Sequence, residues 1–315
     1  MKLLKAVVGS FPQKKLALDE AIKLVVDLQL THGIDIISDG EQRTDIVGYF
    51  GSLPGLGMKS HGPYIKSKVT PMEEAKDFVK LRDLGFVRDY LRNKGREDVK
   101  VKVSVTGPIT LGFSCALNGL EYYNNIGDRR LYSDCARALN PLIMEIAKTG
   151  CYIQIDEPSL SIGIMNPKDA VEIVNEALSG LPKAVYEGRK LIIHICGALN
   201  EKLFKAFMSL DAPILSLAFS ALNVRKNLEV VSKPILESGE KKLGMGCISV
   251  QASKKEEVEK LDAVIKRLKT TVDKIGQDRI ALIHPDCGLR NTGEGAIEPI
   301  LETLSSCASF FEQAP

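Results

Sequence analysis

The sequence predicts an α/β protein with a single (β/α)8 TIM barrel that occupies residues 1–315. Short apolar runs alternate with longer amphipathic segments along the whole chain, which is typical of strand–helix units in a parallel sheet. This alternation repeats eight times, which favours a closed barrel. No G-x-G-x-x-G motif follows the first apolar run, so an open doubly wound sheet is the less favoured alternative.

The eight units can be followed in order along the chain. Strands are expected at residues 4–8, 34–38, 101–105, 152–155, 191–194, 214–217, 242–246 and 279–283. Helical spacing of apolar residues predicts helices at 16–30, 72–94, 129–149, from 166 onward, at 201–210, at 254–275 and at the end of the chain near Phe311. Residues 42–70 are rich in Gly and Pro, which predicts a long functional loop or cap after the second strand.

Composition narrows the class of protein. The formal net charge of +2 gives no electrostatic case for binding nucleic acid or an anionic membrane. No apolar run of about 18 residues suggests a membrane span, and the N-terminal apolar run is too short for a signal peptide. The seven cysteines are odd in number and scattered, which indicates reduced thiols and a cytoplasmic enzyme.

The stretch LIIHICGAL (191–199) carries the first candidate site. Side chains alternate along a strand, so His194 and Cys196 point the same way, and Cys287 follows the eighth strand at the same mouth of a barrel. One imidazole and two thiolates suit a tetrahedral zinc ion with an open position, at which a bound thiol becomes a thiolate nucleophile. The structural alternative is that Cys196 is a small buried hydrophobe and His194 a core histidine.

The other cysteines and histidines are expected to be structural or exposed. Cys247, at the end of the seventh strand, is interpreted as a bystander, with a fourth zinc ligand as the alternative. The remaining assignments are packing for Cys115, Cys135, Cys151 and Cys307, a structural role for His284, a turn for Asp286 and solvent exposure for His32 and His61.

Acidic residues at the strand ends offer a second chemistry. Asp156 and Glu157 are adjacent, so only one of them is expected to point into the barrel, and Glu41 is the other candidate. Two such carboxylates could bind an ammonium group or transfer a proton. A metal-free glycosidase or lyase is the alternative, although an aromatic content of 6% argues against a sugar site.

Six segments together resemble the cobalamin-independent methionine synthases, in the family's order. They are VVGSFPQ (7–13), SDGEQRTDIVGYF (38–50), VTGPITL (105–111), IQIDEPSL (153–160), HICG (194–197) and HPDCGLR (284–290). The chain resembles the C-terminal catalytic barrel alone, as in short archaeal single-domain members. The resemblance implies a zinc enzyme that methylates the thiol of homocysteine.

The resemblance also implies roles for individual residues. His194, Cys196 and Cys287 match zinc ligands. The homocysteine site is matched by Val8, Gly9, Ser10, Glu41 and Asp156. Ser10 and backbone groups would take the carboxylate, while Glu41 and Asp156 would take the ammonium.

Four departures from the family pattern change what is expected of the donor. Ala218 stands where the family has a fourth zinc ligand, and Gln251 where it has a proton-donating histidine. Ser114 and Ile162 replace residues that help to hold the folate. A methylcorrinoid, either methylcobalamin or a corrinoid protein, is therefore the expected methyl donor. The alternatives are a different thiol acceptor such as coenzyme M, and a non-catalytic metal-binding homologue.

Overall fold

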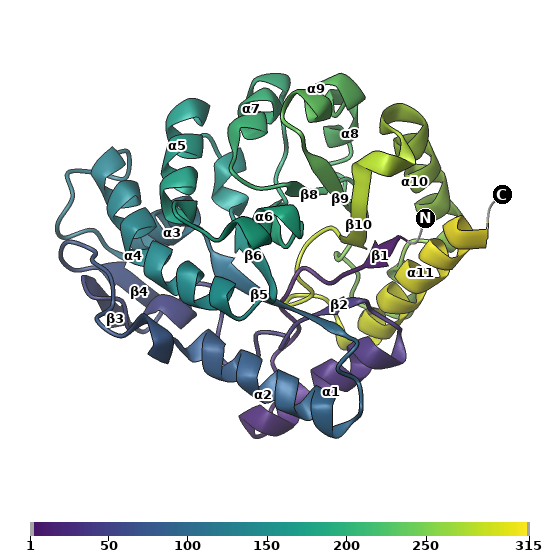
Figure 1. Cartoon of the computed structure of the whole chain (residues 1–315), viewed down its shortest axis with the longest axis horizontal. Coiled ribbons are helices and arrows are strands. Elements are labelled where there is room, and N and C mark those ends of the chain that lie inside the picture. The colour runs from purple at the N-terminus through teal and green to yellow at the C-terminus, as the bar shows by residue number, and fades with distance from the viewer. Residues whose placement is uncertain (1–2, 314–315) are drawn as a thin grey trace.

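Eight parallel strands form the centre of the molecule, and helices surround them (Figure 1). The computed structural model describes residues 3–313. The hydrogen-bonded strand order is β1-β10-β9-β8-β7-β6-β5-β2, and a parallel bridge between Ala6 and Ile36 joins the two ends of this order. The predicted (β/α)8 barrel is therefore confirmed.

The barrel strands lie close to the predicted positions. They are β1 (Leu4–Lys5), β2 (Ile36–Ile37), β5 (Lys100–Thr106), β6 (Tyr152–Asp156), β7 (Leu191–Ile195), β8 (Ile214–Ala218), β9 (Lys242–Ile248) and β10 (Ile280–Pro285). The first two strands are shorter than predicted, because the chain leaves the sheet early to form the turns that carry polar residues into the mouth.

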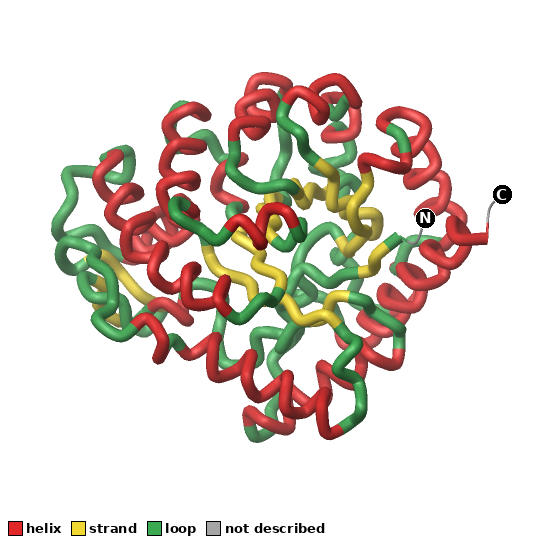
Figure 2. Tube along the Cα trace, in the orientation of Figure 1, coloured by secondary structure: helices red, strands yellow, loops and turns green. Residues whose placement is uncertain are grey.

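Helices follow the strands and cover the outside of the barrel (Figure 2). They are α1 (Leu18–Thr31), α2 (Val79–Asn93), α3 (Pro108–Asn118), α4 (Arg129–Lys148), α5 (Pro167–Leu178), α6 (Lys183–Glu187), α7 (Glu201–Ala206), α8 (Asn227–Val230), α9 (Lys233–Ser238), α10 (Leu261–Ile275) and α11 (Glu294–Gln313). No helix within residues 3–313 combines the length and apolar character that a membrane span requires.

The main differences from the prediction are a hairpin after β2 and several unpredicted helices: α3 and the short helices α6, α8 and α9. Residues 42–70 are not simply a loop, because they contain an antiparallel hairpin of β3 (Leu56–Lys59) and β4 (Gly62–Ile65). Helix α3 was not predicted, because most of its residues are buried and its sequence PITLGFSCALN lacks the apolar–polar alternation of a surface helix.

The interior of the barrel is layered. The inward residues nearest the N-terminal ends of the strands are apolar and form a cluster separate from the main core: Ala6, Ile36, Ile192, Ile214 and Leu282. Two residues further along β7, β8 and β10 the inward positions are polar: His194, Ser216 and His284. The polar layer therefore leads towards the C-terminal mouth, where active sites of this fold lie.

Candidate active site

The structure brings the three predicted metal ligands together at this mouth. Ligand atoms of His194, Cys196 and Cys287 all lie within 4.8 Å of one another. His194 is buried on β7, and its Nε2 atom makes no hydrogen bond to any residue that the structure describes. The neighbouring Cys196 thiol and His194 hold the pKa of the Cys287 thiol well below its usual value, although burial opposes this shift. One nitrogen and two sulfur donors fit zinc, and the orphaned Nε2 is the atom that a metal would bind.

The position at which the resemblance implied a missing fourth ligand is apolar. Ala218 ends β8 and is 1% exposed. It packs with Ala221 and Val224 in a small cluster against Cys196, so it presents no donor atom. Cys247 is buried in the main core and is not part of the described metal group.

Glu41 reaches the mouth through an unusual turn after β2. Gly40 and Glu41 both have left-handed backbone angles, with φ of 72° and 52°. For a non-glycine residue this conformation costs roughly 1 kcal/mol or more and persists where the surroundings enforce it. The Arg290 side chain donates to the Glu41 carbonyl at 2.6 Å and helps to hold the turn.

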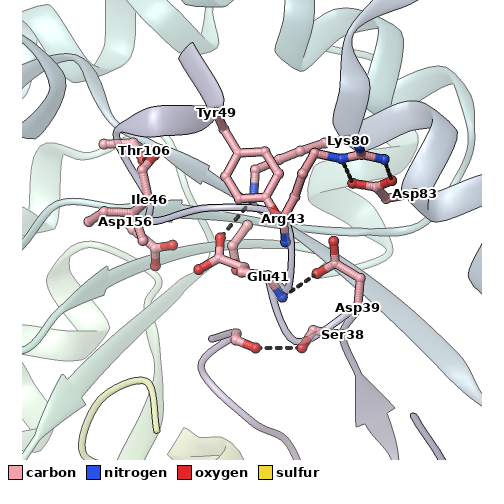
Figure 3. A network of polar contacts seen from close by, with 12 residues as sticks. Ser38, Asp39, Glu41, Arg43, Ile46, Tyr49, Lys80, Asp83, Thr106 and Asp156 are labelled. Carbon is pink, nitrogen blue, oxygen red and sulfur yellow. Dashed lines mark hydrogen bonds and ion pairs between the residues drawn. The ribbon is translucent and has the colours of Figure 1, made fainter. Parts of the chain in front are cut away.

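The Glu41 carboxylate is paired with a buried lysine that the sequence analysis missed (Figure 3). Lys80 Nζ on α2 lies 2.7 Å from Glu41 Oε1, and the two side chains are only 2% and 4% exposed. The ammonium also lies 3.8 Å from the centre of the Tyr49 ring. Burial alone would lower the pKa of Lys80, but Glu41 and Asp39 outweigh it and raise that pKa. The lysine is therefore charged and neutralises Glu41.

Asp156 lies at the end of β6 without a direct cationic partner among the described residues. Its Oδ1 accepts from Gln154 Nε2 at 2.6 Å. Lys102 Nζ binds Gln154 and the carbonyls of Val7 and Val8 instead of Asp156. Burial raises the pKa of Asp156 to about 6, while the nearby His194 opposes the shift. Asp156 is consequently the carboxylate at the mouth that is free to receive a cation.

The segment after β1 is held by its carbonyl groups. The carbonyl of Val8 accepts from Lys102, Ser104 and Gln154, that of Gly9 from Ser38, and that of Ser10 from Leu289. No hydrogen bond among the described residues uses the N–H groups of Val8, Gly9 or Ser10. This segment therefore offers donors, rather than acceptors, to a ligand.

Comparison with known proteins identifies the family. Residues 3–309 match the family described as "Cobalamin-independent synthase, Catalytic domain". This chain belongs to that family. The methionine synthase of Methanocaldococcus jannaschii is 31% identical over 292 residues, which cover 91% of this chain and 85% of the relative. That of Methanothermobacter marburgensis is 30% identical over 311 residues, 98% and 94% of the two chains.

A solved structure from Shewanella sp. W3-18-1 has the same fold. It is described as a B12-independent methionine synthase in complex with selenomethionine, and it aligns with a TM-score of 0.75 at 20% identity over 99% of this chain and 98% of that one. Membership confirms the predicted family and the predicted class of enzyme, a methyltransferase of the methionine synthase type that makes methionine. The family's description as cobalamin-independent counts against the methylcorrinoid donor predicted from the sequence.

Glu157 is bound to the start of α3; the sequence predicted that only one of Asp156 and Glu157 would point into the barrel, without deciding which. Its carboxylate accepts from the N–H groups of Ile109 and Thr110 at 2.9 Å each and from the Thr110 hydroxyl at 2.7 Å. These groups lie at the N-terminus of α3, where a carboxylate is favoured. Only Asp156 of the adjacent pair is left to face the mouth.

Sequence reasoning missed three polar residues of the interior, Lys80, Lys102 and Ser216, and it gave His284 a structural role without identifying its partners. Only some of these residues carried a signal. Lys102 shares a face with Ser104 and Thr106 in the strand KVKVSVT, so a polar inward stripe was readable from the alternation. Ser216 and His284 were readable in the same way on β8 and β10. Lys80 lies in a helix with many charges, and nothing in its local sequence distinguishes it from a solvated lysine.

Proposed function

We propose that this protein is a zinc-dependent methyltransferase that transfers a methyl group to the thiol of homocysteine to form methionine. The observation that carries the proposal is the convergence of His194 Nε2 and two cysteine thiols beside Asp156, an anionic group without a direct cationic partner among the described residues. A thiol amino acid has one group for each of these features.

His194, Cys196 and Cys287 would hold the zinc ion. When bound there, zinc stabilises an incoming thiol as its thiolate at neutral pH. The small apolar cluster around Ala218 leaves the protein side of the site one ligand short, so three protein ligands leave a position for the acceptor sulfur.

The amino-acid end of the acceptor fits the charges around it. Glu41 is paired with Lys80, whereas burial lowers the pKa of Lys102 to about 7 and Lys102 makes no direct bond to Asp156, so a further positive charge beside Asp156 is favoured. An ammonium on Asp156 supplies that charge. The free N–H groups from Val8 to Ser10, with the Ser10 hydroxyl, suit the carboxylate.

The same balance weighs against an acceptor without an amine. A thiol such as coenzyme M would leave Asp156 buried and unpaired, which is costly for a charged group. Homocysteine is therefore the acceptor that the residues favour.

The methyl donor is the point on which the family and the residues disagree. The family is described as cobalamin-independent. The residues from which a methylcorrinoid donor was predicted nevertheless differ from the family pattern. Gln251 cannot donate a proton as an acid, and the apolar Ile162 cannot bind folate through a carboxylate; both side chains are exposed. Parallel assays with methyltetrahydrofolate and with methylcobalamin, each with homocysteine and zinc, decide between the two donors by the methionine formed.

Metal analysis tests the central claim. The purified protein, reduced and supplied with zinc, should hold about one zinc ion per chain, as three convergent ligands predict. Cys196→Ser and Cys287→Ser should lose it, while Cys247→Ala, which removes a buried thiol outside the cluster, should retain it. Absence of zinc from the wild-type protein would exclude the proposal. Zinc without methyl transfer from either donor would instead indicate a non-catalytic homologue.

A further inference from the structure

A chain of three hydrogen bonds leads away from the metal site through the barrel interior. His194 Nδ1 lies 2.8 Å from Ser216 Oγ, and Ser216 Oγ lies 2.8 Å from His284 Nε2. His284 Nδ1 in turn lies 2.6 Å from the carbonyl oxygen of Pro285. All three side chains are buried, at 1–2% exposure, so water does not compete for these groups.

The far end of the chain determines its direction. A carbonyl oxygen only accepts, so His284 Nδ1 must carry a hydrogen and donate it to Pro285. His284 is 2% exposed, and its hydrogen-bond partners, the Ser216 hydroxyl and the Pro285 carbonyl, include no carboxylate that could compensate a charge. The buried ring is therefore uncharged, and its Nε2 carries a lone pair. The Ser216 hydroxyl has one proton and donates it to that Nε2. The Ser216 oxygen is then the acceptor for His194 Nδ1–H.

We propose that Ser216 and His284 are positioning residues that hold His194 in its Nδ1–H tautomer and leave its Nε2 lone pair directed at the metal position. The inference rests on the proposed zinc site. It explains why Nε2, and not Nδ1, is the buried atom without a partner among the described residues. Partners of this kind orient a metal-bound histidine and keep its ligating nitrogen basic.

The sheet provides the space for this contact. Ser216 lies on β8 and His284 on β10, with β9 between them. The inward positions of β9 beside them are Gly244 and Gly246, in register with Ser216 and His284. A Cβ atom at Gly244 would lie 3.2 Å from Ser216 Cα and 3.3 Å from its Cβ. Glycine on the intervening strand lets the histidine reach across to the serine.

Hydrogen bonds running in the opposite direction would have a different, testable consequence. If His284 donated through Nε2, the Ser216 proton would pass to His194 Nδ1, and His194 would carry its own hydrogen on Nε2. That nitrogen could then not bind a metal without losing its proton. The tautomer of His194 in the metal-free protein therefore distinguishes the two directions without any measurement of activity.

Nitrogen-15 NMR of the metal-free protein with labelled histidine makes this measurement, because the chain has only four histidines. We expect His194 as the Nδ1–H tautomer in the wild type. Ser216→Ala should mix the tautomers and weaken zinc binding about 10- to 100-fold. Ser216→Thr, which keeps the hydroxyl, should restore both. His61, which is exposed and remote from the chain of bonds, serves as the internal control.

His284→Phe provides a second variant that keeps a ring and removes the acceptor. With no acceptor at this position, the Ser216 proton turns towards His194, so His194 should shift to the Nε2–H tautomer. An Nε2–H tautomer in the wild type would overturn the inference, as would unchanged tautomer and zinc affinity in folded Ser216→Ala. A wild-type protein that shows the expected tautomer but binds no zinc would instead refute the proposed function.

Discussion

Replacing Lys80 with methionine tests whether the buried ion pair with Glu41 holds the mouth of the barrel together. The charged atoms are 2.7 Å apart and almost fully buried. At an effective dielectric constant of about 20 their attraction is on the order of 6 kcal/mol, part of which offsets the cost of burying the lysine. Removing one partner of such a pair costs about 3–5 kcal/mol. Urea denaturation of Lys80→Met at pH 7 should show a loss of free energy of unfolding of that size.

Two controls separate charge from packing. Glu41→Gln combined with Lys80→Met should recover much of the loss, because no buried charge is then unpaired. Arg129→Met breaks an ion pair of similar length, 2.8 Å, whose side chains are 54% and 48% exposed, and should cost less than about 1 kcal/mol. The reasoning is refuted if folded Lys80→Met lies within about 1 kcal/mol of the wild type, or if the double variant is no better than the single one.

Three further predictions concern the acceptor site and the scaffold. Asp156→Asn should raise the KM for homocysteine at least tenfold and should change the KM for a thiol without an amine little. Glu41→Gln should show a smaller selective effect, because Lys80 already neutralises that carboxylate. Steady-state kinetics with both thiols measures this, and equal effects on the two thiols would contradict an ammonium site. In the wild type, the KM for homocysteine divided by the KM for the amine-free thiol should rise as the pH falls through about 6, because protonated Asp156 cannot pair with an ammonium. A bound divalent metal favours the carboxylate and should move this transition to a lower pH. A ratio that stays constant from pH 8 to pH 5 would contradict the prediction. Gly107→Ala should destabilise the fold by about 1–3 kcal/mol, because the new Cβ would lie 2.2 Å from Glu157 Oε1. Gly85→Ala, with open space around it in α2, should stabilise the fold by up to about 1 kcal/mol. The unfolding temperatures of the two variants should therefore change in opposite directions.

The barrel was predictable because its evidence is repeated along the chain. Each apolar run and each amphipathic segment is a local signal, and eight repeats leave few alternatives. The same alternation predicts that His194, Cys196 and Cys287 meet at one mouth, and the structure places them there. Helix α3 was missed for the opposite reason, since a helix buried on most sides lacks a polar face to reveal its period.

The partners of the site residues were harder to predict from the sequence than the site residues themselves. Glu41 could be named from the sequence, but its pairing with Lys80 depends on the left-handed turn at Gly40 and Glu41 and on the position of the first turn of α2, which carries Lys80. Contacts of this kind join residues 39 positions apart, and no local pattern encodes them. The hydrogen-bond chain from His194 to His284 was partly predictable. The alternation of side chains along a strand predicts that its members face the barrel interior, but it does not predict which atom donates and which accepts.

In the proposed arrangement, each half of the site would have one participant fewer than the resemblance to the family implied. On the metal side Ala218 offers no ligand, and on the acceptor side Glu41 is already neutralised by Lys80. Binding would then depend more heavily on the groups that remain, among them His194 for the metal and Asp156 for the ammonium. A site without spare contacts should respond steeply to changes that disturb these two residues indirectly. Substitutions at Ser216 or Gln154, which touch neither the metal nor the acceptor in the proposed arrangement, should for this reason weaken binding of their respective ligands.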